Sequence, residues 1–152
     1  MNDLTKSIGH IDVATHPSFV RLRKQAEFAT VDESSIDEFV DADGLKLAIF
    51  ADDPNTRKET IDIVVIAPEL KKAFNGTLSR TVIADFAVAR SLAARWGLRS
   101  MPALAVFRDN EFLGAVQGIQ NWGDYCEKLV EILQTKRSSP RVIAILNKDE
   151  NA

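Results

Sequence analysis

The chain has few residues that could perform covalent chemistry, and the first of these is its single cysteine, Cys126. One cysteine excludes an intramolecular disulfide and any Cys-x-x-Cys redox pair. Cys126 falls on the apolar stripe of a predicted helix, where a cysteine is typically a small hydrophobic residue of the core. A thiol oxidoreductase that uses Cys126 with a partner's cysteine is therefore the enzyme alternative that the sequence leaves open.

The two histidines, His10 and His16, lie close together near the N-terminus and have no cysteine near them. A metal site needs three or four converging ligands, and this pair does not supply them. A Ser-His-Asp triad needs a histidine in the body of the chain, and no Gly-rich phosphate loop is present. We therefore expect no catalytic residue, no metal and no cofactor.

Four carboxylates form a more informative group. Asp52 and Asp53 follow a predicted strand, and Glu59 and Asp62 lie on the first turns of the helix after it. Solvation and attraction to the positive end of the helix dipole are enough to explain such a pattern. The functional interpretation is an acidic rim that attracts arginines, because carboxylates pair well with the guanidinium group.

Composition bounds the rest of the chain. A length of 152 residues predicts one domain, and a net charge of -3 gives no basic footprint for nucleic acid. No apolar run is long enough to span a membrane, and no signal peptide is visible at the N-terminus, so we expect a cytoplasmic protein without membrane insertion. We divide the chain into a loose N-terminus (1–15), one domain (16–137) and a tail (138–152).

The tail holds an apolar segment, 142–146, which could add to the sheet, pack on a helix or mediate assembly. The oligomeric state stays open for this reason, and a homo-oligomer is one of the possibilities.

The pattern of apolar and polar residues predicts alternating strands and helices, which must position the candidate functional residues. We expect strands at 28–31, 45–51, 79–84, 103–107 and 111–117, and helices at 17–26, 36–43, 59–74, 86–96 and 122–133. Pro68 should kink the long helix, whose early half is apolar nearly all round and should be deeply covered. Asn121 should cap the last helix, with Trp122 and Val130 on its inward stripe.

The stretch 96–119, WGLRSMPALAVFRDNEFLGAVQGI, resembles the C-terminal half of a thioredoxin, in which the proline that matches Pro102 is cis. The segment around Pro68 resembles the kinked helix that follows the thioredoxin Cys-x-x-Cys motif. The motif itself falls here on residues without sulfur: Thr60, Ile61, Asp62 and Ile63. The resemblance implies an α/β thioredoxin-like fold, a central mixed sheet flanked by helices, with the cis-proline loop kept and the redox cysteines absent.

The pair Met101-Pro102 has two interpretations. It either sets the geometry of the turn before the strand, or it offers backbone groups beside the proline to an extended peptide, as in strand addition. The second interpretation survives the loss of the cysteines.

Three blocks carry a narrower resemblance: FADDP at 50–54, the segment 63–74 with VVIAPELKKAF, and the segment 96–122, which ends in GIQNW. They are similar to the HyaE/HupG/HoxO family of hydrogenase expression proteins. The resemblance implies a non-catalytic chaperone in the maturation of a nickel–iron uptake hydrogenase, which binds the small-subunit precursor and its twin-arginine signal peptide before export. A redox-inactive scaffold or adaptor subunit is the other possibility. The expected peptide-binding residues are Asp52, Asp53, Glu59, Thr60, Asp62, Ser100, Met101 and Pro102.

Overall fold

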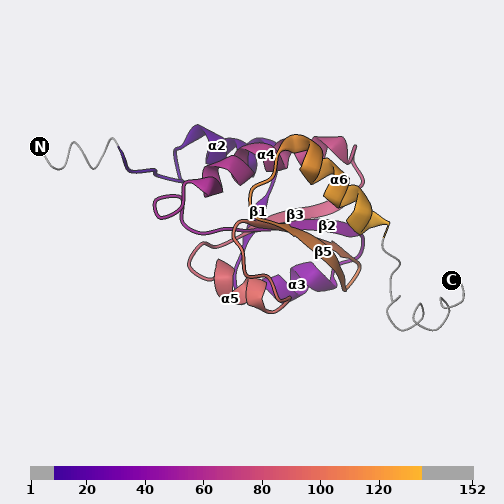
Figure 1. Ribbon diagram of the computed structural model, residues 1–152. Coiled ribbons are helices and arrows are strands. Elements are labelled where there is room, and N and C mark those ends of the chain that lie inside the picture. Colours follow the sequence, from indigo (N-terminus) through magenta and orange to yellow (C-terminus); the bar gives the residue numbers. More distant parts are fainter. Residues whose placement is uncertain (1–8, 135–152) are drawn as a thin grey trace, which may run out of the picture.

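The computed structural model describes residues 9–134, which form a five-stranded mixed sheet between two layers of helices (Figure 1). The strand order is β1-β3-β2-β4-β5. Strands β1, β3 and β2 run parallel, whereas β4 is antiparallel to β2 and β5 is antiparallel to β4. The strands are β1 (Ala29–Val31), β2 (Leu45–Phe50), β3 (Leu78–Ala84), β4 (Ala103–Arg108) and β5 (Glu111–Gln117).

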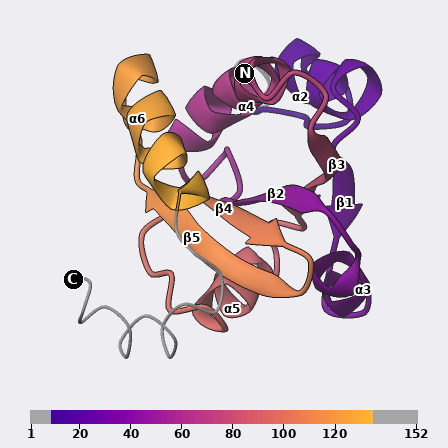
Figure 2. The ribbon, with the colours of Figure 1, turned by 90° about the vertical axis from the view of Figure 1, so that its right-hand side faces the viewer.

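The helices divide between the two faces of the sheet (Figure 2). One face carries α2 (Pro17–Val20), the π-helical turn η1 (Arg21–Gln25), α4 (Glu59–Ala73) and α6 (Trp122–Leu133). The other face carries α3 (Ile36–Asp41) and α5 (Ala89–Ala94). The predicted mixed sheet flanked by helices is thereby confirmed.

Local sequence explains several of these elements. Strand β2 reads LKLAIF and lies in the middle of the sheet, so its residues are almost all buried. Pro68 lies inside α4, as predicted. The Asn121 side chain caps α6 because its Oδ1 accepts the Asp124 amide at 2.8 Å. Gly44 has φ of 99° and no room for a side chain, since a Cβ there would lie 2.5 Å from Ser79 Oγ.

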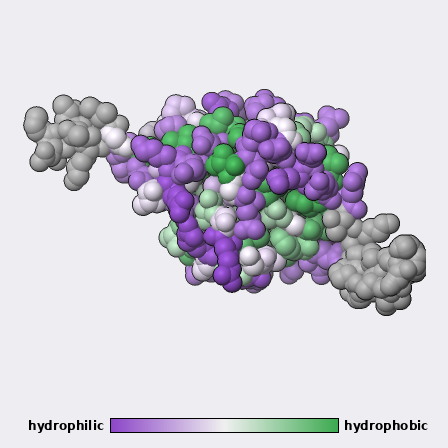
Figure 3. Space-filling model, viewed as in Figure 1, coloured by the Kyte–Doolittle hydropathy of each residue, from purple (hydrophilic) through white to green (hydrophobic). Residues whose placement is uncertain are grey.

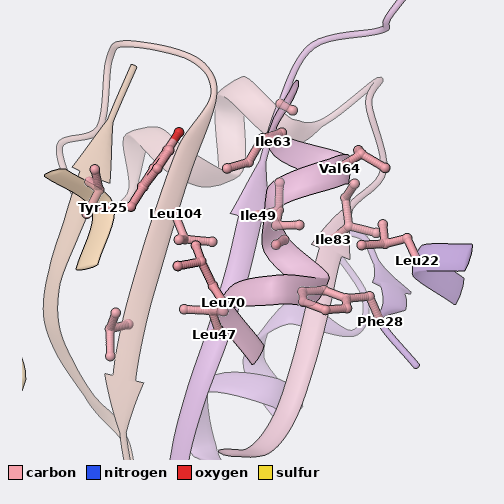
Figure 4. Close-up of a cluster of buried hydrophobic side chains, with 14 of the residues drawn as sticks. Leu22, Phe28, Leu47, Ile49, Ile63, Val64, Leu70, Ile83, Leu104 and Tyr125 are labelled. Carbon is pink, nitrogen blue, oxygen red and sulfur yellow. The ribbon is translucent and has the colours of Figure 1, made fainter. Parts of the chain in front are cut away.

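Two hydrophobic cores hold the layers together. The first lies between the sheet and the helices α4 and α6 (Figure 4). Its larger members include Leu22, Phe28, Leu47, Ile49, Ile63, Leu70, Leu104 and Tyr125. The second lies under α3 and α5 and is rich in aromatic contacts, among Phe39, Phe50, Trp96, Phe107 and Phe112. Burial of apolar surface stabilises both cores, and it is the main favourable term in folding.

One charged residue, Lys46, is buried on the side of the sheet that carries α3. Lys46 is fully buried on β2, and its Nζ donates to the carbonyl oxygens of Phe39 at 2.9 Å and Asp109 at 2.6 Å, and also to those of Val40 and Ala42. Three of these carbonyls end α3 and the fourth belongs to the β4–β5 turn. A single ammonium thus ties the end of a helix to a hairpin.

Some expectations about apolar faces are wrong. Val65, Trp122 and Val130 were expected to face inward, but they are 42%, 47% and 50% exposed. The reason is geometric: each helix turns one face to the sheet, so apolar residues beyond that face stay in solvent. On the face seen in Figure 3, hydrophobic patches lie among hydrophilic side chains.

Two boundaries also differ from the expectation. Helix α5 begins at Ala89, and Asp85 instead caps a preceding turn through the amide of Ala87 at 3.1 Å. Residues 11–15 were expected to be loose, but both backbone groups of Ile11 are hydrogen-bonded to the Asn55 side chain, at 2.7 and 2.9 Å. The apolar segment 142–146 lies outside the described residues.

Candidate functional site

The candidate site lies where the start of α4, the loop at Met101-Pro102 and the β5–α6 turn meet. The Met101-Pro102 peptide bond is cis, as predicted. The amide of Gly118 donates to the Pro102 carbonyl at 2.8 Å, which holds the β5–α6 turn against the proline loop. The Gln117 side chain accepts the amides of Arg99 and Ser100 at 2.9 and 3.1 Å, so the same loop is also fixed from β5.

The two positions that match the cysteines of the redox motif, Thr60 and Ile63, are buried. Thr60 is buried, and its hydroxyl donates to the Asp52 carbonyl at 2.7 Å, which pins α4 to the end of β2. Ile63 is buried in the first core. Between them, Asp62 is exposed, as is Glu59 one residue before Thr60. The first turn of α4 therefore presents carboxylates and no nucleophile.

Asp52 is engaged within the chain. Its carboxylate forms a bidentate pair with Arg90 of α5, at 2.8 Å for both contacts, and lies 3.4 Å from the Arg57 guanidinium. The hydrogen bond to Asp52 raises the pKa of Arg90 above its ordinary value. Asp53 accepts the Asn55 backbone amide at 2.8 Å and so shapes its own loop. Neither arginine was expected at this site from the sequence.

These contacts divide the face into two halves. The half at the loop 52–58 carries the cations Arg57 and Arg90, which surround Asp52. The other half includes the first turns of α4, where Glu59 and Asp62 are exposed, and the β5–α6 turn, where Ile119 is 39% exposed.

Tyr125 links this second half to the core. It is fully buried on α6, and its hydroxyl donates to the Gly118 carbonyl at 3.3 Å. Burial raises the pKa of Tyr125, and the negative charge of Asp62 adds to the same effect.

The described residues offer little for catalysis. Cys126 is half-buried on α6 and packs against the first core. Within residues 9–134, no group of three or more His, Cys, Asp or Glu side chains is placed to hold a metal ion. In the same part of the chain no helix is long and apolar enough to cross a membrane. A hollow of about 330 Å³ between η1 and the end of α4 lies on other elements, and it is lined by residues such as Arg21, Pro68 and Lys72.

Comparison with known proteins gives consistent matches. A family model described as "Hydrogenase-1 expression protein HyaE" matches residues 19–125. The chain is 31% identical to the hydrogenase expression/formation protein HupG of Bradyrhizobium diazoefficiens, over 76% of this chain and 80% of that protein. It is 32% identical to the hydrogenase expression/formation protein HoxO of Azotobacter vinelandii, over 84% of this chain and 85% of that protein.

Solved structures show the same fold with little sequence similarity. A thioredoxin of Plasmodium falciparum matches 68% of this chain and 96% of its own, with a TM-score of 0.51 and 16% identity. A designed protein matches 71% of this chain and 94% of its own, with a TM-score of 0.56 and 19% identity. The fold is therefore thioredoxin-like, and the single cysteine excludes the redox pair.

Proposed function

Because the chain belongs to the HyaE family of hydrogenase expression proteins, we propose that it is a non-catalytic chaperone in nickel–iron uptake hydrogenase maturation. It binds the small-subunit precursor and its twin-arginine signal peptide in the cytoplasm, before export. The family match supports a role in hydrogenase maturation. The partner and the mode of binding are the parts that the experiment below tests.

One observation carries the proposal: the thioredoxin-like face is kept while the redox positions are closed. Thr60 is buried and bonded to the backbone of Asp52, and Ile63 is part of the core. A face that cannot react but still presents carboxylates and apolar side chains is suited to binding. A twin-arginine leader, with paired arginines followed by an apolar run, is complementary to it in charge and polarity.

We assign the eight expected residues three kinds of role. Asp52, Asp53 and Thr60 shape the site, because their polar groups are bonded within the chain. Glu59 and Asp62 are exposed and would pair with the arginines of the leader. Ser100, Met101 and Pro102 form the loop along which an extended peptide would lie.

The test is a calorimetric titration of the purified protein with a synthetic leader peptide of a hydrogenase small subunit. A control peptide has both arginines replaced by glutamine. Saturable binding that weakens by about tenfold or more with the control supports the proposal, because paired guanidinium–carboxylate contacts would be lost.

Equal binding of both peptides would show that the arginines do not contribute to recognition of the leader. No binding of either would overturn recognition of the leader, and co-purification with the mature small subunit would then distinguish a chaperone from a scaffold.

A further inference from the structure

We propose that two arginines at the end of the sheet, Arg57 of the loop 52–58 and Arg90 of α5, are a binding site for a carboxylate side chain of the protein partner. The two residues are called the arginine pair below. Under the proposed function the partner is the small-subunit precursor, so this inference rests on that function and deepens it with a second contact. The carboxylate would lie against the outer edges of the two guanidinium groups, which Asp52 holds side by side.

One carboxylate oxygen brings the two arginines together. Arg90 Nη2 lies 2.8 Å and Arg57 Nε lies 3.4 Å from the same atom, Oδ2 of Asp52. The other oxygen of Asp52 accepts Arg90 Nε at 2.8 Å, so a two-point contact fixes the plane of the Arg90 guanidinium. Two cations at one carboxylate leave one positive charge in excess, and a second carboxylate would balance it.

The other ion pairs within residues 9–134 are balanced. In each of them one cation faces one carboxylate: Arg95 with Asp37, Arg80 with Glu38, and Lys72 with Glu69. Their carboxylate side chains are more than half exposed, whereas the Asp52 side chain is only 15% exposed. Asp52 is therefore a positioning residue beneath the arginine pair, and the arginines form the surface.

Most hydrogen-bond donors of the arginine pair are unused. A guanidinium has five N–H donors in a rigid fork. Among the described residues, neither Nη atom of Arg57 and not Nη1 of Arg90 takes part in a hydrogen bond or an ion pair. Both side chains are about half exposed, so a partner can reach them. A carboxylate matches the fork because its two oxygens can accept two parallel N–H groups.

The loop holds Arg57 in position before a partner binds. The Arg57 amide donates to the Asp53 carbonyl at 2.9 Å, and the Asn55 side chain anchors the same loop to the N-terminal segment at 2.7 and 2.9 Å. The Thr60 hydroxyl donates to the Asp52 carbonyl at 2.7 Å, which fixes the residue that holds both arginines. Side chains that are positioned in advance lose less freedom on binding.

The register of the sheet places the arginine pair beside the loop proposed to bind the peptide. Phe50, the last residue of β2, pairs with Ala103, the first residue of β4. Asp52 follows Phe50 by two residues, and Pro102 directly precedes Ala103, so both lie at the same end of neighbouring strands. A chain bound along the loop 100–102 lies next to the end of β2, which favours a side chain of that partner over a free anion as the occupant.

Two other carboxylates at this end of the sheet are turned to backbone amides. Asp53 accepts the amide of Asn55 at 2.8 Å, and Asp85 accepts the amide of Ala87 at 3.1 Å. Neither forms an ion pair within residues 9–134. The arginine pair repels the arginines of a leader, so its carboxylate comes from a different part of the precursor.

The first experiment tests the arginine pair without the precursor. The Nε–H signals of the arginines in the full chain are followed by nuclear magnetic resonance during titration with the peptide acetyl-Gly-Glu-Glu-Gly-amide. The signals of Arg57 and Arg90 should shift in a saturable way, whereas the signal of Arg95, held by its own carboxylate, should not. The same peptide with glutamine in place of glutamate should shift none of them.

Inorganic phosphate distinguishes the two sources of an anion. A shift of Arg57 and Arg90 with phosphate but not with the acidic peptide would assign the arginine pair to a free anion and overturn the proposal. Equal shifts at Arg95, or no shift with either probe, would overturn it as well.

The second experiment measures binding of the purified small-subunit precursor. In Arg57→Gln the two-point contact between Asp52 and Arg90 remains, so the variant should fold normally, as circular dichroism and thermal unfolding would check. Its affinity should fall by about threefold, and its association should depend less on salt. The control Arg95→Gln removes an arginine of similar exposure, 45% against 49%, and should leave both quantities unchanged.

The outcomes separate this inference from the proposed function. If the wild-type chain binds the precursor and Arg57→Gln binds it as tightly as Arg95→Gln does, the arginine pair is not a contact and the proposed function stands. If the wild-type chain does not bind the precursor, the proposed function fails and the precursor is not the source of the carboxylate, whereas the resonance titration still decides whether the arginine pair binds one.

Discussion

Replacing the buried Lys46 by methionine tests the main unexpected feature of the fold. Methionine keeps much of the volume but removes the ammonium that bonds to four carbonyl oxygens, three at the end of α3 and one in the β4–β5 turn. The helix end and the hairpin would then lose their common tie. We expect the variant to fold with the same sheet and with lower stability.

The magnitude follows from the carbonyls that remain. Leaving a buried acceptor unpaired costs about 1–3 kcal/mol, and the carbonyl of Phe39 is fully buried, whereas the other three bonds are partly buried. Water can reach the partly buried carbonyls, and the ammonium no longer has to be desolvated. We therefore expect the free energy of unfolding to fall by about 2–4 kcal/mol, well below the sum of four charged hydrogen bonds.

Urea denaturation of the wild type and of Lys46→Met measures this difference, and Lys128→Met, at an exposed lysine of α6, is the matched control. Amide exchange should accelerate in α3 and in the β4–β5 turn before the rest of the sheet. A loss below about 1 kcal/mol, comparable with that of an ordinary surface substitution, would refute the reasoning.

The pH dependence of this difference has a defined sign. Burial lowers the pKa of the Lys46 ammonium from its ordinary value of 10.5. The unfolded chain therefore holds this proton more tightly, and the Lys46 contribution to stability increases as the pH rises toward 10.5. The deficit of Lys46→Met should widen over that range.

Three further predictions concern the candidate site. Asp52→Asn should lower the midpoint of thermal unfolding, because Arg90 loses its bidentate partner, and an unchanged midpoint would show that this pair does not stabilise the loop. Burial raises the pKa of Tyr125 above 10.0, so the unfolded state loses this proton more readily and stability should fall as the pH rises above 10.0. Tyr125 is the only tyrosine, so its ultraviolet absorbance follows this titration directly, and Tyr125→Phe should flatten the alkaline loss. Cys126→Ala should leave hydrogenase maturation unchanged in cells, and rapid labelling of Cys126 in the folded protein would instead support the oxidoreductase alternative.

Features that depend on neighbouring residues were predictable from the sequence. The apolar run of β2, the turn between β4 and β5, the proline inside α4 and the Asn121 cap are all local patterns, and the structure contains each of them. Both strands of the hairpin and the proline before it fall where the patterning places them. Local chemistry, together with the resemblance to thioredoxins, was enough to identify the fold.

Features that depend on tertiary contacts were not predictable. Asp52 and Arg90 are 38 positions apart, and no spacing rule joins a strand end to a distant helix. Lys46 could be recognised as a charge in an apolar strand, but its partners are backbone carbonyls, which have no sequence signal. Trp122 and Val130 fit an apolar stripe on α6 that is wider than the surface the sheet covers.

The burial of Thr60 and Ile63 limits what could be engineered at these positions. Cysteines introduced at Thr60 and Ile63 would restore the spacing of the motif without restoring its chemistry, because both sites are almost inaccessible and a reactive thiolate must be reached by its substrate. Recovery would also require the bond between the Thr60 hydroxyl and the Asp52 carbonyl to be broken and the loop 52–58 to be reshaped. A reactive thiol pair at these two positions would therefore require changes in the surrounding packing as well as the two substitutions.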